Sequence, residues 1–367
     1  MTGRPLSAVI LAAGEGTRMK SARPKPVHVL CGRPMVLHVV DALADLLVDR
    51  VVVVVGHGAE RVTKTLLESA PPKLTIDFVE QRVQRGTGDA VMVALTAFHE
   101  DEVEDGDIVV LPGDTPLLRP ETLEALVDAH RTADAAATVL TTRLADPSGY
   151  GRVVRDRNGG VSGIVEQSDA TREQLAIDEV NTSIYCFRHS ILAPALRRLS
   201  PENAQGEYYL TDVVGVLHDA GYPVVSRVVA DPMEAAGVND RAQLAAAEAE
   251  LRSRTNARWL RLGVTMFDPD RTYIDASVEL APDVTLLPGT LLQGRTWVGS
   301  GAQLGPDVRL VDCMVGEGAV VENTVARQSE IGVDARVGPY VFLAPGSRVP
   351  HGMVTGPFFT AADEERA

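Results

Sequence analysis

The chain has 367 residues, of which 45% are hydrophobic, and a formal net charge of −15 at neutral pH. This length suffices for two domains with separate cores, and the hydrophobic content is ordinary for a globular protein. The acidic balance argues against a general nucleic-acid-binding protein, because such proteins need a basic surface. No uncharged stretch approaches the roughly 20 residues of a membrane helix, so we expect no membrane partner.

Strand and helix signals alternate over the first 230 residues. Apolar runs predict strands, and stretches of helix-forming residues between them predict helices. The predicted strands are 7–11, 51–55, 75–79, 107–111 and 136–140, and two clear predicted helices are 35–47 and 88–98. This alternation is typical of the α/β fold class, with a Rossmann-like, mostly parallel sheet, which we assign to residues 1–240.

The first predicted strand runs directly into a loop with glycines and cations. Its sequence is Leu11-Ala12-Ala13-Gly14-Glu15-Gly16-Thr17-Arg18-Met19, and Pro24-Lys25 follows. Small residues let backbone N–H groups approach phosphate oxygens, and two cations neutralise their charge. The segment matches neither the P-loop nor the dinucleotide-binding motif. The alternative is a plain strand–turn–helix junction with two solvated cations.

The three cysteines, Cys31, Cys186 and Cys313, are far apart and show no pairing or metal-ligand spacing. We therefore expect buried, reduced thiols and a cytoplasmic location. Asp114 follows the apolar strand 107–111, where a carboxylate can hold Mg²⁺. The alternative for Asp114 is a cap on the next helix.

The composition changes after residue 240. Residues 241–262 are dense in strong helix formers and predict one linking helix. Residues 263–357 carry aliphatic residues every six positions, a period typical of hexapeptide-repeat parallel β-helices. The repeat positions are Ile274, Leu280, Leu286, Leu292, Val298, Leu304 and Leu310, and then, after a slip, Val325, Ile331, Val337, Leu343 and Val349.

Several ordered motifs accompany this domain plan. They are Gln81 with 84–88, then 113–116, 146–152, 163–166, 179–182, 203–212 and 237–239. With the opening loop and the repeats, they make the chain resemble the bacterial bifunctional N-acetylglucosamine-1-phosphate uridylyltransferase/glucosamine-1-phosphate acetyltransferase family. The resemblance implies a left-handed β-helix. It also implies a cytoplasmic transferase that makes UDP-N-acetylglucosamine, a peptidoglycan precursor, from UTP and N-acetylglucosamine 1-phosphate.

The resemblance also implies site residues. Arg18 and Lys25 are expected to be catalytic, and Asp114 and Asn239 to hold Mg²⁺. The expected nucleotide-binding residues are Leu11, Ala12, Ala13, Gly14, Gln81, Gly86 and Thr87. The expected sugar-phosphate-binding residues are Gly151, Glu166, Asn181, Thr182, Tyr209 and Thr211. Without the resemblance, we would interpret Asn239 as a turn residue and Tyr209 as a core residue.

The second domain departs from the family. The repeats stop near Val349, Ala344 stands where the family has an arginine, and His351 lies in a turn that we expect to be solvated. We therefore expect a truncated β-helix without acetyltransferase activity, followed by an acidic tail over 358–367. The resemblance implies a homotrimer through the β-helix, and the alternative is that the acidic tail from Asp363 caps the shortened β-helix. Two alternatives remain: another nucleotide and sugar, such as dTTP with glucose 1-phosphate, and a non-catalytic nucleotide-sugar sensor.

Overall fold

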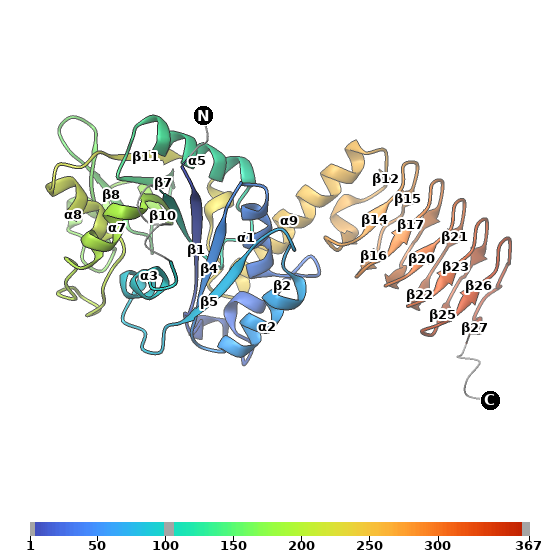
Figure 1. Ribbon diagram of the computed structural model, residues 1–367. Coiled ribbons are helices and arrows are strands. Elements are labelled where there is room, and N and C mark those ends of the chain that lie inside the picture. Colours follow the sequence, from blue (N-terminus) through green and yellow to red (C-terminus); the bar gives the residue numbers. More distant parts are fainter. Residues whose placement is uncertain (1–3, 99–105, 362–367) are drawn as a thin grey trace. The chain divides into compact units, whose positions relative to one another are not determined.

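The computed structural model describes residues 4–98 and 106–361 (Figure 1). The chain divides into two compact units. The first comprises Met1–His28 with Pro34–Leu244, and the second comprises Val29–Arg33 with Ala245–Ala367. The short hairpin of β2 (Val29–Leu30) and β3 (Arg33–Pro34) thus lies mostly in the second unit, although the sequence places it well inside the first domain.

The first unit is built on a nine-stranded sheet (Figure 1). Its strands are β1 (Leu6–Ala12), β4 (Arg50–Val55), β5 (Ile76–Glu80), β6 (Asp107–Pro112), β7 (Ala137–Arg143), β8 (Arg152–Arg155), β9 (Val161–Val165), β10 (Glu179–Arg188) and β11 (Val224–Val228). The main order is β11-β7-β10-β6-β1-β4-β5, with β8 and β9 attached beside β10. Strands β6, β1, β4 and β5 are mutually parallel, whereas β10 runs antiparallel to both its neighbours. The expected mostly parallel sheet is confirmed.

Helices cover both faces of this sheet. They are α1 (Met35–Ala44), α2 (Ala59–Ser69), α3 (Thr87–Leu95), α5 (Pro120–Thr132), α6 (Arg172–Leu175), α7 (His189–Leu196) and α8 (Asp212–Asp219). The short 3-10 helices are η1 (Thr17–Met19), η2 (Lys25–Val27) and η3 (Pro232–Ala235). Two helices end earlier than predicted, at Ala44 and Leu95, because the chain continues there as tight turns.

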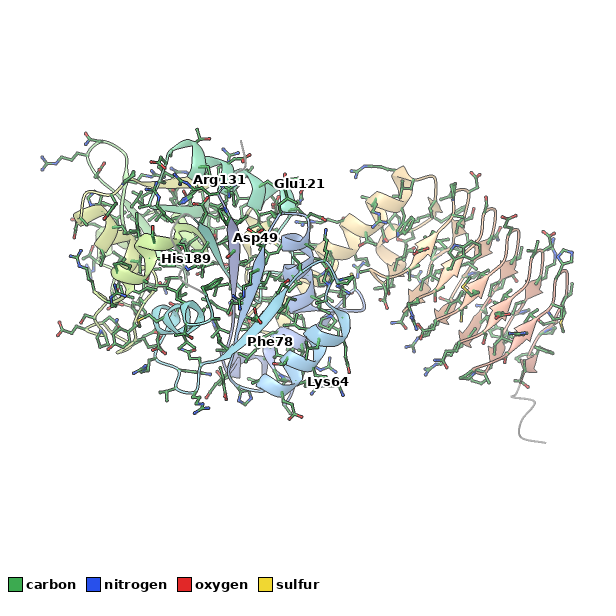
Figure 2. All side chains as sticks on the ribbon, in the orientation of Figure 1. Asp49, Lys64, Phe78, Glu121, Arg131 and His189 are labelled. Carbon is green, nitrogen blue, oxygen red and sulfur yellow. The ribbon has the colours of Figure 1, made fainter. Side chains whose placement is uncertain are left out.

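The central strands β1, β4 and β6 read as nearly unbroken apolar runs because both of their faces are buried. In β4, Val51 and Val53 point to a core shared with α1, α2 and α5, whereas Val52 and Val54 point to a core shared with α3, α7 and α8. At the open edge of the sheet, Lys64 on α2 and Phe78 on β5 are among the residues that line a shallow groove (Figure 2).

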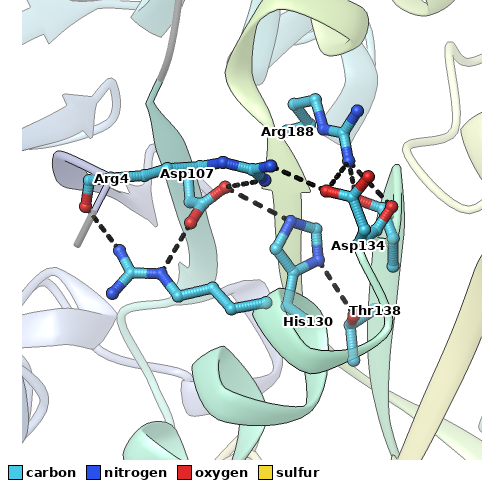
Figure 3. Close-up of polar contacts among 8 residues, drawn as sticks. Arg4, Asp107, His130, Asp134, Thr138 and Arg188 are labelled. Atoms are coloured by element: carbon cyan, nitrogen blue, oxygen red, sulfur yellow. Dashed lines mark hydrogen bonds and ion pairs between the residues drawn. The ribbon is translucent and has the colours of Figure 1, made fainter. Parts of the chain in front are cut away.

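A buried ionic cluster ties the start of β6 to α5 (Figure 3). Asp107 has no exposed surface, and it accepts a hydrogen bond from Nε of Arg131 at 2.8 Å. His130, equally buried, has Nε2 3.5 Å from the same carboxylate and bonds Thr138 Oγ1 through Nδ1 at 2.9 Å. Arg4 reaches the cluster from the amino-terminal side and also pairs with Asp134 at 2.7 Å. These contacts stabilise the sheet at the amino-terminal end of β6.

The second unit contains most of α9 (Arg241–Arg261) and three parallel sheets stacked in coils. The first sheet consists of β12 (Thr265–Met266), β15 (Thr285–Leu286), β18 (Gln303–Leu304), β21 (Val320–Val321) and β24 (Arg336–Val337). The second consists of β13 (Thr272–Ile274), β16 (Thr290–Gln293), β19 (Arg309–Val311), β22 (Thr324–Arg327), β25 (Val341–Leu343) and β27 (Thr360–Ala361). The third consists of β14 (Glu279–Leu280), β17 (Trp297–Val298), β20 (Met314–Val315), β23 (Glu330–Ile331) and β26 (Arg348–Val349). A short 3-10 helix, η4 (Pro269–Arg271), precedes β13.

These three sheets form the expected left-handed parallel β-helix, with aliphatic side chains stacked in its interior. One predicted inward position is wrong. Val325 is 38% exposed, and its neighbour Ala326 is buried between Leu310 and Leu343 in the stack. The coil is shortened there, so a strict six-residue count from Ile331 arrives one residue too early. Because side chains alternate along a strand, that shift moves the inward position to the outer face.

The predicted tail, 358–367, is partly described. Its residues Thr360 and Ala361 form β27 and continue the second sheet beside β25. The acidic residues from Asp363 onward lie outside the described residues. The three cysteines are free and buried, as predicted.

Candidate active site

A cleft of about 460 Å³ opens where the parallel strands β1, β5 and β6 end. Carboxyl ends of parallel strands meet at one edge of a sheet, which is where α/β proteins bind ligands. The cleft is lined by most of the predicted site residues. These are Leu11, Ala12, Ala13, Gly14, Lys25, Gln81, Gly86, Thr87, Asp114, Gly151, Glu166, Asn181, Thr182 and Asn239.

The opening loop presents two cations to one end of the cleft. Lys25 Nζ donates to Oδ1 of Asn239 at 2.9 Å and also contacts the carboxylate of Asp114. Arg18 on η1 is exposed and does not line the cleft, but its Nη2 donates to the same Asn239 oxygen at 3.0 Å. Gly16 has φ +62° and faces Lys25 so closely that an added Cβ would lie 2.7 Å from the lysine Cβ. A glycine is therefore required for the loop to pass Lys25.

A second loop borders the cleft between β5 and α3. Gly86 has φ +107°, and an added Cβ would lie 2.6 Å from the carbonyl oxygen of Tyr208. The hydroxyl of Thr87 accepts a hydrogen bond from the backbone N–H of Leu210 at 3.0 Å. This contact holds the first turn of α3 against segment 208–210. Gln81 lies at the end of β5 with its side chain turned towards Gly86 and Asp89.

The opposite wall of the cleft comes from β9, β10 and the turn before α8. In β10 the register against β7 shifts between Asn181 and Tyr185, and Ser183 adopts φ +62°. Asn181 donates through Nδ2 to the Tyr185 hydroxyl at 2.7 Å and accepts from the Ser183 N–H at 3.1 Å. Thr182 donates to the carbonyl of Leu140 at 2.7 Å, so its hydroxyl can only accept from a ligand.

Glu166 is the carboxylate of this wall. Burial raises the pKa of Glu166, an effect that the hydrogen bond from Thr211 partly opposes. Thr211 donates to Oε1 of Glu166 at 3.2 Å without lining the cleft itself. Tyr209 is only 7% exposed and does not line the cleft, which fits the alternative that it is a core residue.

The sequence motifs contain lining residues that we did not single out. Gln84 donates to the carbonyl of Ala13 at 2.6 Å and thereby braces the opening loop. Tyr150 faces the cleft, and burial, followed by the charge of Asp114, raises its pKa. Both lie inside motifs used for the resemblance, so residue-by-residue attention to those motifs could have found them. Glu207 and Gly237 also lie inside quoted motifs, whereas Ser183 lies just outside one and carried no signal of its own.

The oxygens of Asp114 and Asn239 suit a divalent cation. Both contact the single ammonium group of Lys25, which shows that they converge on one cationic centre. Among the described residues there is no cluster of three or more His, Cys, Asp or Glu side chains that could hold a metal ion. Two protein oxygens completed by water and phosphate is the arrangement that Mg²⁺ adopts in nucleotide sites.

An α/β domain with a cationic, glycine-containing loop and two converging oxygens at the strand ends fits the class of nucleotidyltransferases. Residues 8–214 match the family described as the MobA-like NTP transferase domain. Bifunctional protein GlmU of Streptomyces avermitilis is 47% identical over 347 residues, which cover 94% of this chain and 71% of that protein. GlmU of Thermobifida fusca is 49% identical, with 90% and 68% covered, and GlmU of Kineococcus radiotolerans is 49% identical, with 94% and 69% covered. The chain belongs to the GlmU family.

The resemblance drawn from the motifs is thus confirmed. The chain is a nucleotidyltransferase of the kind that forms UDP-N-acetylglucosamine. Its substrates are a nucleotide and a sugar phosphate, and enzymes of this class use a divalent metal ion. Within the described residues, no helix is both long and apolar enough to cross a membrane.

Proposed function

We propose that the cleft joins UTP to N-acetylglucosamine 1-phosphate with Arg18, Lys25, Asp114 and Asn239 as the reacting centre. The observation that carries this proposal is the convergence of two cations and two oxygen ligands on one point at the strand ends. A phosphate oxygen of the sugar 1-phosphate attacks the α-phosphorus of UTP. The bond from that phosphorus to the bridging oxygen breaks, and pyrophosphate leaves. The nucleophile is already an anion, so no general base is required.

Arg18 and Lys25 bind the triphosphate and neutralise the charge that grows on the leaving pyrophosphate. Asp114 and Asn239 would hold Mg²⁺, which would neutralise phosphate charge in the cleft when bound. Lys25 must leave its present partners in order to reach a phosphate. The opening loop, Leu11 to Gly14, offers backbone N–H groups and no bulky polar side chain that would block the nucleotide.

The nucleotide and the sugar phosphate bind to opposite walls of the cleft. Gln81, Gly86 and Thr87 border the nucleobase, where the glycine allows close backbone approach. The sugar and its phosphate lie against the other wall, in which Glu166 accepts from a hydroxyl and Asn181 meets the N-acetyl amide. The other residues assigned to that wall are Gly151, Thr182, Tyr209 and Thr211, of which Thr211 acts through its hydrogen bond to Glu166.

We infer a homotrimer through the β-helix. The outer face of the second β-helix sheet carries a column of partly exposed apolar residues. Tyr273, Leu291, Val325 and Phe342 occupy successive places in it, interrupted by Arg309. Phe342 is 47% exposed and Tyr273 is 41% exposed. Association of copies would remove this surface from water.

We also infer a cytoplasmic enzyme that performs no acetyl transfer. Three free buried thiols suit a reducing compartment. Ala344 stands where the resemblance implies an arginine, and His351 lies exposed in a turn. Acetylation of glucosamine 1-phosphate by the purified chain with acetyl-coenzyme A would contradict the second inference.

The function is tested by pyrophosphate release from the purified chain with Mg²⁺. UTP with N-acetylglucosamine 1-phosphate is compared with dTTP and glucose 1-phosphate in all combinations. We expect the first pair to give the highest kcat/KM. A higher kcat/KM for another pair would assign that pair as the substrates. No turnover with any pair would favour the alternative of a non-catalytic nucleotide-sugar sensor.

A further inference from the structure

We propose that Asp89 is a positioning residue that fixes the amide orientation of Gln81 and so selects a nucleobase with a ring N–H. The proposal rests on the proposed function in one respect, the placement of the base beside Gln81. It assigns a role to a side chain that touches neither substrate nor metal.

Asp89 is a buried carboxylate in the first turn of α3, with 2% of its surface exposed. The amino end of a helix favours negative charge, and Nη2 of Arg85 lies 2.8 Å from Oδ1 of Asp89. The Asp89 carboxylate is therefore held in place. Its other oxygen, Oδ2, accepts a hydrogen bond from Nε2 of Gln81 at 2.8 Å.

These contacts decide which way the Gln81 amide points. Carboxylate oxygens accept hydrogen bonds, and the Gln81 group that faces Asp89 is its NH₂. The same nitrogen donates its second hydrogen to the carbonyl of Gly86 at 3.2 Å. Both Gln81 donors are thus used, and the oxygen Oε1 is the polar atom left to meet a ligand in the cleft.

An acceptor at that position discriminates between bases by their ring nitrogen. Uracil carries N3–H, which donates to an acceptor, whereas N3 of cytosine is itself an acceptor and would face the Gln81 oxygen without a hydrogen. An unmatched pair of buried acceptors costs binding free energy, which gives the discrimination. Thymine shares the uracil N3–H, so this device separates uracil and thymine from cytosine and leaves the choice between uracil and thymine to other contacts.

The charge of Arg85 allows the orientation of the Gln81 amide to be tested with the single substitution Asp89→Asn. In Asp89→Asn, Arg85 attracts the new amide oxygen, so the new NH₂ turns to Gln81. Gln81 then reverses to offer its oxygen to Asn and its NH₂ to the base, and it gives up its hydrogen bond to the Gly86 carbonyl. The reversed amide matches the cytosine ring nitrogen and opposes the uracil N3–H.

The experiment measures kcat/KM for UTP and for CTP in wild type, Asp89→Asn and Asp89→Asn with Arg85→Ala. We expect the UTP:CTP ratio to fall about tenfold in Asp89→Asn, or ~1.4 kcal/mol. We expect partial recovery of the ratio in the double variant, where nothing attracts the Asn oxygen. The KM for the sugar phosphate should not change. A ratio within twofold of wild type in Asp89→Asn would overturn the proposal.

A second comparison separates positioning from bracing of α3. In a Gln81→Leu background, Asp89→Asn should leave the UTP:CTP ratio unchanged, since there is no amide to turn. An equal effect in both backgrounds would mean that Asp89 only braces the helix. Should Asp89→Asn fail to fold, wild type is tested with 3-deaza-UTP, in which C–H replaces N3–H. We then expect about a tenfold loss relative to UTP, and equal use of the two nucleotides would overturn the proposal.

Failure of this proposal is distinguishable from failure of the proposed function. A wild-type enzyme without uridylyltransferase activity would refute the function. A wild-type enzyme that prefers UTP, with a ratio insensitive to Asp89, would refute only the role of Asp89.

Discussion

Lys25 Nζ lies 2.9 Å from Oδ1 of Asn239, although the two residues are 214 positions apart in the chain. The same ammonium contacts the carboxylate of Asp114. Lys25 therefore lies against the two oxygens that we propose as ligands of Mg²⁺, so a divalent ion bound there would compete with this lysine. The variants Asp114→Ala and Lys25→Met test the two sides of this competition.

Asp114→Ala should lower kcat about 1,000-fold, because it removes a charged metal ligand from the reacting centre. The fold should survive, since the Asp114 side chain is partly exposed at a strand end. Pyrophosphate release under saturating substrates measures the loss, and thermal unfolding checks the fold. Asp128→Ala, which alters an exposed acid on α5 that does not line the cleft, serves as the control. Turnover near the wild-type rate in Asp114→Ala would contradict the metal assignment.

Lys25→Met should act in opposite directions on metal binding and on catalysis. Without the competing ammonium, Mn²⁺ should bind the nucleotide-free protein more tightly, by about fivefold. Turnover should still fall about 100-fold, because a cation that neutralises phosphate charge is lost. Calorimetric titration with Mn²⁺ and steady-state kinetics measure the two effects. Unchanged Mn²⁺ affinity would show that Lys25 does not compete with the metal ion.

Tyr185→Phe should weaken sugar binding without slowing the reaction of bound substrates. It removes the acceptor of the Asn181 Nδ2 hydrogen bond, so the amide loses one of its two fixed contacts. We expect KM for N-acetylglucosamine 1-phosphate to rise about fivefold, at a cost in stability of about 1 kcal/mol. The KM for UTP and kcat should stay within twofold. Tyr222→Phe, at an exposed tyrosine, is the matched control, and a parallel rise in both KM values would indicate a general structural defect instead.

Asp107→Asn should destabilise the first unit by about 2 kcal/mol at neutral pH. Burial by itself raises the pKa of Asp107, but hydrogen bonds from His130 and Arg131 outweigh it, so its pKa lies below the ordinary 3.8. A depressed pKa in the folded state means that the stabilisation is complete above the unfolded pKa. It is lost as the pH falls through the folded value.

The difference in unfolding free energy between wild type and Asp107→Asn should therefore be constant from pH 7 to 5 and shrink below about pH 4. Urea unfolding at several pH values measures it. A difference that persists undiminished at pH 3 would show that the ionised carboxylate is not what stabilises the fold.

Phe342→Glu should dissociate the proposed trimer, because it places a charge in the outer apolar column of the β-helix. Sedimentation equilibrium should then give the monomer mass, with uridylyltransferase activity retained because the cleft lies in the first unit. Val333→Glu alters another exposed apolar residue that lies outside that column and should leave the mass unchanged. A wild-type protein that is itself monomeric would refute the trimer.

Much of the secondary structure of this protein could be predicted from local sequence patterns. The apolar runs predicted β1, β4, β5, β6 and β7 to within a few residues. Burial on both faces makes the central strands β1, β4 and β6 nearly apolar throughout, whereas β5 at the sheet edge is only half-buried. The helix-forming run 241–262 predicted α9, and the six-residue period predicted the β-helix. The loop that joins β1 to the cations was readable because small residues and charges stand next to one another in the chain.

Only the tertiary structure decided the contacts between segments far apart in sequence. Sheet order brings Asn239 to Lys25, and the coil stacking places Ala326 rather than Val325 inside. The pairing of Asp89 with Gln81 is short in sequence, yet it depends on the turn that reverses the chain between β5 and α3. Periodicity reports which face of an element is buried, whereas hydrogen bonds between side chains depend on distances of a few ångströms that only the packed elements fix.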